Sequence, residues 1–275
     1  MPELVDTHCH IQSAGNPLGE PATRALWARD SGLTGDSLVR NATQHGVTKL
    51  ICVGCDQADS QLAIDFVKRR ANCWASIGIH PHEAKDYVGN QARLDKFAGL
   101  ARAPKVIAIG ECGLDYFYGH SPRSDQISLL KFQIELALTH NLPLIFHIRE
   151  AFDDFWPIFD DYHTAVQKVR GVVHSFTDTE ANLDKAVARG LYIGVNGIAT
   201  FVKDPSQRAV YRSIPPNNLL LETDAPYLTP TPYRGSINEP KQVLTVAKFL
   251  SDLRSEEFST LATTTSRNAH TLFSI

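Results

Sequence analysis

The sequence predicts a (β/α)8 barrel, and three observations lead to this prediction. Eight short apolar runs recur along the chain, and most are continuously hydrophobic, as strands buried on both faces of a parallel sheet are. Segments with helical spacing of apolar residues lie between the runs. The 275 residues, 43% of them hydrophobic, are close to the roughly 250 that such a barrel takes. A doubly wound open sheet is the alternative.

The apolar runs give the expected strands in chain order. They are residues 4–10, 49–54, 73–80, 106–113, 143–148, 171–176, 191–197 and 218–226. Helical patterns cover 36–46, 124–141, 180–190, 239–253 and about 255–269. We expect Ser124 or Asp125 to cap the helix over 124–141. No linker, repeat or shift in composition divides the chain, so residues 1–275 are expected to form a single domain.

Composition excludes several classes of protein. Lys and Arg number 27 against 30 Asp and Glu, a net charge of -3, so any nucleic-acid contact should be local. No apolar run approaches the roughly 20 residues that span a membrane, and no signal-peptide pattern precedes the first strand. Five scattered cysteines favour a reducing compartment, and we expect a cytoplasmic protein. Cys52 and Cys55 lack a second pair and are interpreted as a strand cysteine and a loop thiol, not a zinc knuckle.

Three long segments follow predicted strands, and in a barrel they would lie at the carboxyl-end face, where active sites form. They are residues 11–35, 115–122 and 225–240. The first contains Trp27 and is expected to be a functional or mobile loop. Tyr116, Phe117, Tyr118, Phe176 and Phe201 also follow strands, where they either stack on bases or pack loops together.

Histidines and carboxylates end most of these strands. They are His8 and His10, His80 with His82, Glu111 with Asp115, His147, His174, and Glu222 with Asp224. A single histidine at such a place is usually a packing residue, but burying several polar groups without partners costs several kcal/mol each. A metal cluster supplies the partner. Imidazoles and carboxylates without thiolates suit Zn, Mn, Fe, Co, Ni or Mg, and do not distinguish among them.

The alternation of side chains along a strand indicates which residues share a face of the sheet. Alternation places Leu4, Asp6, His8 and His10 on one face, and Asp6 is a candidate to orient an imidazole. Cys9 and Cys112 are out of phase with the ligand positions, so we exclude both as ligands. Two-metal hydrolytic sites hold their ions about 3.5–4 Å apart, which favours a bridging carboxylate, and Glu111 is the natural bridge.

The motifs DTHCH, GIHPH, GECGLDY, HIR, HSFT, ETDAPYL, PYRG and RNAHTLF occur in the order and spacing of the TatD-type metal-dependent deoxyribonucleases. The chain resembles this family over nearly its whole length. The family belongs to the amidohydrolase superfamily of (β/α)8 barrels, so the resemblance implies two divalent metal ions. The first would be held by His8, His10, Glu111 and Asp224. The second would be held by Glu111, His147 and His174.

The resemblance also implies metal-dependent hydrolysis of phosphodiesters, typically as a 3′→5′ exonuclease, with single-stranded DNA or a DNA 3′ end as substrate and a role in DNA repair. In this interpretation Asp224 and Glu111 are the catalytic carboxylates, and Asp224 is the general base. Arg149 and Arg234 are candidates to clamp phosphate oxygens, and His80 to contact the scissile phosphate or a water. We expect a monomer.

The chain departs from the family pattern at three places. Asp178 stands where the family commonly has Gly, Cys112 replaces an aliphatic residue, and residues 11–35 are longer than typical. Two other functions stay open: a small-molecule amide, ester or lactone hydrolase of the same superfamily, and a barrel that binds metal without turnover. A carbamylated Lys bridges the metals in many relatives, so Glu111 at this position favours the nuclease.

Overall fold

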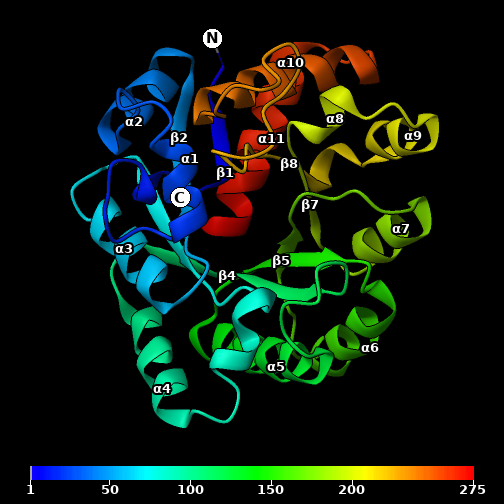
Figure 1. Ribbon diagram of the computed structural model, residues 1–275. Coiled ribbons are helices and arrows are strands. Elements are labelled where there is room, and N and C mark those ends of the chain that lie inside the picture. The colour runs from blue at the N-terminus through cyan, green and yellow to red at the C-terminus, as the bar shows by residue number, and fades with distance from the viewer. Residues whose placement is uncertain (1) are drawn as a thin grey trace.

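The computed structural model describes residues 2–275, and within them eight strands form one parallel sheet that curves into a barrel (Figure 1). The strands are β1 (Leu4–Cys9), β2 (Val47–Val53), β3 (Cys73–Ile77), β4 (Val106–Asp115), β5 (Leu144–Arg149), β6 (Gly171–Val173), β7 (Tyr192–Val195) and β8 (Leu219–Leu221). Each strand pairs in parallel with the next along the chain. The predicted fold class is confirmed.

The last strand returns to the first through the segment that follows β8. The Asp224 N–H donates to the His8 carbonyl at 2.8 Å, and the His10 N–H donates to the Ala225 carbonyl at 2.8 Å. Cys9 and Ala225 form a parallel bridge. These contacts close the barrel and exclude the open doubly wound sheet. They also bring residues more than 200 positions apart to one rim.

Helices surround the sheet (Figure 1). They are α1 (Pro21–Trp27), α2 (Gly35–Gln44), α3 (Gln57–Val67), α4 (Gln91–Gly99), α5 (Arg123–His140), α6 (Phe152–Tyr162), α7 (Glu180–Ala188), α8 (Ile198–Phe201), α9 (Pro205–Ser213), α10 (Val243–Arg254) and α11 (Phe258–Phe273). The predicted cap of α5 is wrong. Pro122 occupies the cap position, and the Ser124 hydroxyl donates to Asp125 instead. Proline fixes the φ that a helix start requires.

The core has two parts. A smaller cluster gathers Val5, Ile51, Val53, Ala108, Ile145, Val172 and Leu220 with Ala269, Leu272 and Phe273 of α11. Side chains from so many strands meet only inside the barrel, so this cluster fills its interior. The larger cluster packs the helices against the outer face of the sheet. No helix within residues 2–275 has the length and apolar character that crossing a membrane requires.

Residues 11–35 are more ordered than the sequence pattern indicates. They contain a short 3-10 helix, Ile11–Ser13, and α1, whose first N–H groups donate to the Glu20 carboxylate. Trp27 is buried, and its indole N–H donates to the His10 carbonyl at 3.1 Å. The segment therefore packs directly behind one of the predicted metal ligands.

Candidate metal centre

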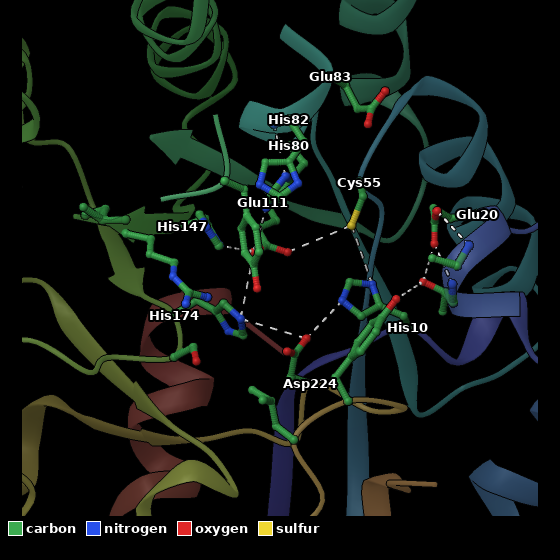
Figure 2. Close-up of a pocket in the computed structure, with 18 of the residues that line it drawn as sticks. His10, Glu20, Cys55, His80, His82, Glu83, Glu111, His147, His174 and Asp224 are labelled. Atoms are coloured by element: carbon green, nitrogen blue, oxygen red, sulfur yellow. Dashed lines mark hydrogen bonds and ion pairs between the residues drawn. The ribbon is translucent and has the colours of Figure 1, made fainter. Parts of the chain in front are cut away.

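A cavity of about 900 Å³ opens at the carboxyl ends of the strands (Figure 2). The predicted site residues that line it are His10, His80, Glu111, His147, Arg149, His174 and Asp224. His8 lies beneath them and is fully buried. Several strands end earlier than the sequence pattern suggests. His80, His174 and Asp224 consequently sit just beyond their strands, on backbone that turns into the cavity.

The first group of ligand atoms consists of His8, His10, Glu111 and Asp224. His8 Nε2 lies 3.2 Å from His10 Nε2 and 3.4 Å from Glu111 Oε2. Asp224 Oδ1 lies 3.2 Å from His10 Nε2 and 3.7 Å from His8 Nε2. Ligands of a tetrahedral ion with bonds of 2.0–2.1 Å are about 3.4 Å apart. Of these four side chains, His8, His10 and Glu111 lie close enough to hold an ion together, whereas Asp224 groups with His8 and His174.

The orientation of His10 provides a second test of the fit. Its Nδ1 lies 2.8 Å from the Val53 carbonyl, which can only accept, so the ring proton resides on Nδ1. The lone pair on Nε2 then faces the Asp224 carboxylate, which is also an acceptor when ionised. Burial lowers the pKa of His10, but Cys55 and Asp224 raise it well above its usual value, so without metal a proton on Nε2 bridges the 3.2 Å contact, and a divalent ion would take the place of that proton. The donor set thus fits a divalent metal ion.

The second group surrounds the other oxygen of Glu111. Oε1 lies 2.8 Å from His147 Nδ1, 3.6 Å from His80 Nε2 and 4.0 Å from His174 Nε2. Glu111 thus faces the first group with Oε2 and this group with Oε1, as a bridging carboxylate would. His80, Glu111 and His147 lie close enough to hold an ion together, and so do His8, His174 and Asp224.

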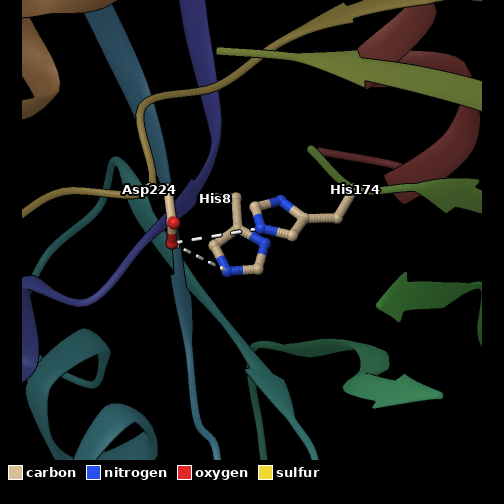
Figure 3. Close-up of side chains that lie close together, drawn as sticks. All are labelled: His8, His174 and Asp224. Carbon is tan, nitrogen blue, oxygen red and sulfur yellow. Dashed lines mark ion pairs between the residues drawn. The ribbon is translucent and has the colours of Figure 1, made fainter. Parts of the chain in front are cut away.

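His174 lies beside His8 and Asp224 (Figure 3), and its Nε2 is also 4.0 Å from Glu111 Oε1 in the second group. Its ring stacks on that of His8, with centroids 3.6 Å apart, and its Nε2 is 4.0 Å from Asp224 Oδ1. On the opposite side of the ring, Nδ1 lies 2.9 Å from Glu222 Oε1. Glu222 is fully buried. A Cβ at Gly194 would lie 2.3 Å from Glu222 Oε2, so this carboxylate needs a glycine in β7 beside it.

Asp115 supports His147 in a similar way. Its Oδ2 lies 2.9 Å from His147 Nε2 and 3.1 Å from His82 Nε2, which leaves His147 Nδ1 directed at Glu111. The close approach of β4 and β5 depends on Gly113, which pairs with His147 and has a φ of 151°. A Cβ there would lie 1.9 Å from the His147 carbonyl oxygen.

Glu111 and Asp224 are both ionised. Burial alone would raise the pKa of Glu111, but the surrounding His80, His147 and His8 imidazoles hold that pKa well below its usual value. Burial is likewise outweighed at Asp224, where His10, His174 and His8 lower the pKa. Burial opposes protonation of His147 and His174, yet their carboxylate partners raise both pKa values to about 9. In the absence of metal, the protons on His147 and His174 therefore balance the negative charge of the Glu111 and Asp224 carboxylates.

Comparison with known proteins settles the family. The family model described as TatD related DNase matches residues 5–274. The chain belongs to this family. A Shigella flexneri protein named 3′-5′ ssDNA/RNA exonuclease TatD is 33% identical over 264 residues, which cover 94% of this chain and 98% of that protein. A Bacillus subtilis protein named uncharacterized metal-dependent hydrolase YabD is 32% identical, covering 99% of each.

A solved structure agrees with these sequences. YJJV, a TatD homolog from Escherichia coli, superposes with a TM-score of 0.86 at 28% identity, covering 99% of this chain and 98% of that one. The resemblance inferred from the motifs is therefore confirmed, as is the prediction of a hydrolase acting on phosphodiester bonds. The small-molecule hydrolase is not favoured.

One prediction about a side chain needs revision. Asp6 contacts neither imidazole. It accepts from the backbone N–H groups of His8 and Thr223 and from the Thr223 hydroxyl. Irregular register on either side of it interrupts the simple alternation of β1. Asp6 therefore ties β1 to the segment after β8 and acts on His8 only through the backbone.

Cys55 is a site residue that sequence reasoning missed. Its Sγ lines the cavity, 3.8 Å from His10 Nδ1 and 4.0 Å from Glu111 Oε2 (Figure 2). Burial raises the pKa of this thiol to about 12, so it is protonated. The C-x-x-C pattern drew attention to the residue but gave no reason to place it beside His10.

The two predicted arginines lie in different environments. Arg149 lines the cavity, whereas the Arg234 guanidinium stacks on Phe201 and donates to the Thr229 carbonyl. Among the five aromatic candidates, Tyr118 lines the cavity and Phe176 is buried. Tyr116 donates to Asp154, with Arg123 over its ring. Phe117 lies beneath Arg149.

Proposed function

We propose that this protein is a metal-dependent 3′→5′ exonuclease that removes nucleotides from single-stranded DNA ends, with two divalent ions shared through Glu111. The observation that carries the proposal is the position of Glu111. One carboxylate oxygen faces His8 and the other faces His147. The first ion is assigned to His8, His10, Glu111 and Asp224, and the second to Glu111, His147 and His174. Mg, Mn, Zn, Fe, Co and Ni all suit this donor set.

Two bound ions would supply Lewis acidity to a water molecule and to the phosphate oxygens. The protein's own groups do the rest. Asp224 is ionised and partly open to the cavity, with 16% of its side chain exposed, so its carboxylate can accept the proton of the attacking water. Its backbone adopts a φ of 59°, held by the N–H bond to His8, which directs the carboxylate into the cavity.

Side chains in the cavity wall are placed to contact the substrate. His80 lies 3.6 Å from Glu111 Oε1 and is partly exposed, so its imidazole can donate to an oxygen of the scissile phosphate. Arg149 supplies a guanidinium to a phosphate oxygen. Arg234 lies against Phe201 outside the cavity, and its phosphate contact remains a prediction.

The curated relatives named as 3′-5′ ssDNA/RNA exonucleases support the polarity of attack and the single-stranded substrate. We further propose that residues 1–275 act as one catalytic domain, as a monomer, and that DNA ends generated during repair are its substrates. The five free cysteines support a reducing, cytoplasmic setting.

Labelled oligonucleotides test the proposal. The purified protein is incubated with single-stranded DNA labelled at the 5′ or the 3′ end, in Mg²⁺ or Mn²⁺ and in chelator. We expect a ladder of progressively shortened products from the 5′-labelled strand, and release of labelled mononucleotide from the 3′-labelled one. Single-stranded RNA of the same sequence measures sugar preference. Turnover of a lactone and amide panel without shortening of either strand would refute the nuclease.

A further inference from the structure

Charge is distributed unevenly around the cavity mouth. Among the described residues that line it, Arg149 is the only lysine or arginine. Five carboxylates outside the proposed ligand set also line the cavity, and we call them the acidic rim: Glu20, Asp56, Glu83, Glu150 and Asp178. Glu20 keeps its charge, because N–H groups of Thr23 and Ala22 outweigh the effect of burial and lower its pKa. A polyanion that continued past the cavity would meet carboxylates around much of its rim.

Aromatic rings, not carboxylates, position Arg149 in the cavity wall. Its guanidinium carbon lies 4.0 Å from the centroid of the Phe117 ring and 4.8 Å from that of Tyr118. Within residues 2–275 it forms no ion pair, whereas surface arginines such as Arg189 are paired with a carboxylate. Aromatic faces position a guanidinium without neutralising it. Arg149 therefore presents an uncompensated charge at a fixed place in the wall.

Tyr118 provides an apolar surface beside that charge. Its ring lines the cavity and is 52% exposed, and it stacks with His120 at a centroid distance of 5.7 Å. An exposed aromatic ring next to a cation is the arrangement that stacks a nucleobase and contacts its phosphate. Because Arg149 is the only lysine or arginine among the described residues that line the cavity, this wall offers a phosphate contact to one nucleotide beside the ring.

We infer that the cavity wall forms a subsite for one nucleotide beyond the scissile phosphate, with its phosphate on Arg149 and its base on Tyr118, and that the acidic rim opposes longer strands. This inference rests on the proposed exonuclease function. It makes short oligonucleotides and short single-stranded 3′ ends the preferred substrate class. Asp178 adds one of the opposing charges.

The length dependence of turnover tests the inference. Release of mononucleotide is measured for oligodeoxythymidylates of two, three, five and ten nucleotides over a range of salt. We expect kcat/KM to change less than about twofold beyond three nucleotides. Its log–log slope against salt should be near −1.4, since two contacted phosphates contribute about −0.7 each. A steady rise to ten nucleotides, with a slope several times steeper, would overturn the inference and leave the exonuclease intact. No release from any length would overturn both.

Variants test the two parts of the subsite. Tyr118→Ala should raise KM for the trinucleotide by about 5- to 150-fold with little change in kcat, because stacking contributes about 1–3 kcal/mol, while Tyr118→Phe should stay within about twofold. Tyr233→Ala is the matched control, since Tyr233 is 49% exposed but lies outside the cavity. An unchanged KM for Tyr118→Ala would overturn the base contact.

Charge reversal tests the rim. Glu83→Lys and Glu150→Lys should each raise kcat/KM for the ten-nucleotide strand by about twofold relative to the trinucleotide, as expected for removing one repulsion and adding one attraction roughly 8 Å away in screened solvent. If neither variant changes this ratio, the rim does not set the length preference and the inference is wrong.

Discussion

Replacing Glu111 by glutamine should weaken the binding of both metal ions at once. The amide keeps the shape of the side chain but removes its charge, and the two carboxylate oxygens face different groups, with Oε2 at 3.4 Å from His8 and Oε1 at 2.8 Å from His147. Each lost charged interaction costs about 1.5–3 kcal/mol, or about 10- to 150-fold in affinity. At a free metal concentration of about ten times the wild-type Kd, each site of the variant should therefore be between about half occupied and almost empty.

Calorimetric titration with Mn²⁺, together with elemental analysis of the dialysed protein, measures this effect. His147→Gln and His10→Gln are the matched controls, since each removes a ligand from one group and should cost one ion. Metal at a hundred times its Kd should raise the Tm of the wild type by about 4–5 °C per ion, and Glu111→Gln should lose this gain. If Glu111→Gln kept one ion at wild-type affinity, Glu111 would not be the bridge.

Three further predictions follow from the site. Asp224→Asn should lower kcat by about 100-fold or more and change KM much less, because it removes the proton acceptor; an unchanged kcat in steady-state assays would exclude this role. With His147 and His174 at pKa values raised to about 9, the metal-free protein should lose stability as pH rises from about 6.5 to about 9. Metal affinity should rise over the same window, and melting curves with and without Mn²⁺ at each pH would reveal the opposite trends. Gly113→Ala should cost about 2–5 kcal/mol of stability, since its Cβ would meet the His147 carbonyl; a urea midpoint equal to that of the wild type would contradict the close approach.

The sequence pattern predicted the barrel because a strand buried on both faces leaves a continuous apolar run. It predicted the end of a strand less well where polar side chains continue an extended backbone. Residues 171–176 and 218–226 look like longer strands, yet β6 and β8 end at Val173 and Leu221. Beyond those points the backbone turns inward, with Ser175 and Asp224 at positive φ, and local sequence does not encode that turn.

That these histidines and carboxylates gather was predictable, because the carboxyl ends of parallel strands meet at one rim. Which imidazole lies nearest each carboxylate oxygen was not predictable from the sequence. Glu111 Oε1 lies 3.6 Å from His80 but 4.0 Å from His174, and such differences depend on barrel radius and side-chain rotamers. Cys55 was missed for the same reason, because its place beside His10 is set by the connection between β2 and α3.

The supporting groups explain how the imidazoles are held ready for metal. The nitrogen facing away from the metal groups lies 2.8 Å from the Val53 carbonyl in His10, 2.9 Å from Asp115 in His147 and 2.9 Å from Glu222 in His174. Such partners fix ring orientation and increase the basicity of the nitrogen that faces the metal. Within residues 2–275 neither His8 Nδ1 nor His174 Nδ1 has a hydrogen-bond partner of good geometry, but His174 Nδ1 has the Glu222 carboxylate as an ion-pair partner, whereas His8 Nδ1 has no such neighbour.

The orientation of His8 therefore rests on packing instead, through its stacking on the His174 ring at 3.6 Å. Because Glu222 holds His174 from behind, and Glu222 in turn occupies the space left by Gly194, one glycine in β7 indirectly positions an imidazole of β1. The first motif of the chain thus depends on residues of β7 and of the segment after β8, both near the opposite end of the sequence.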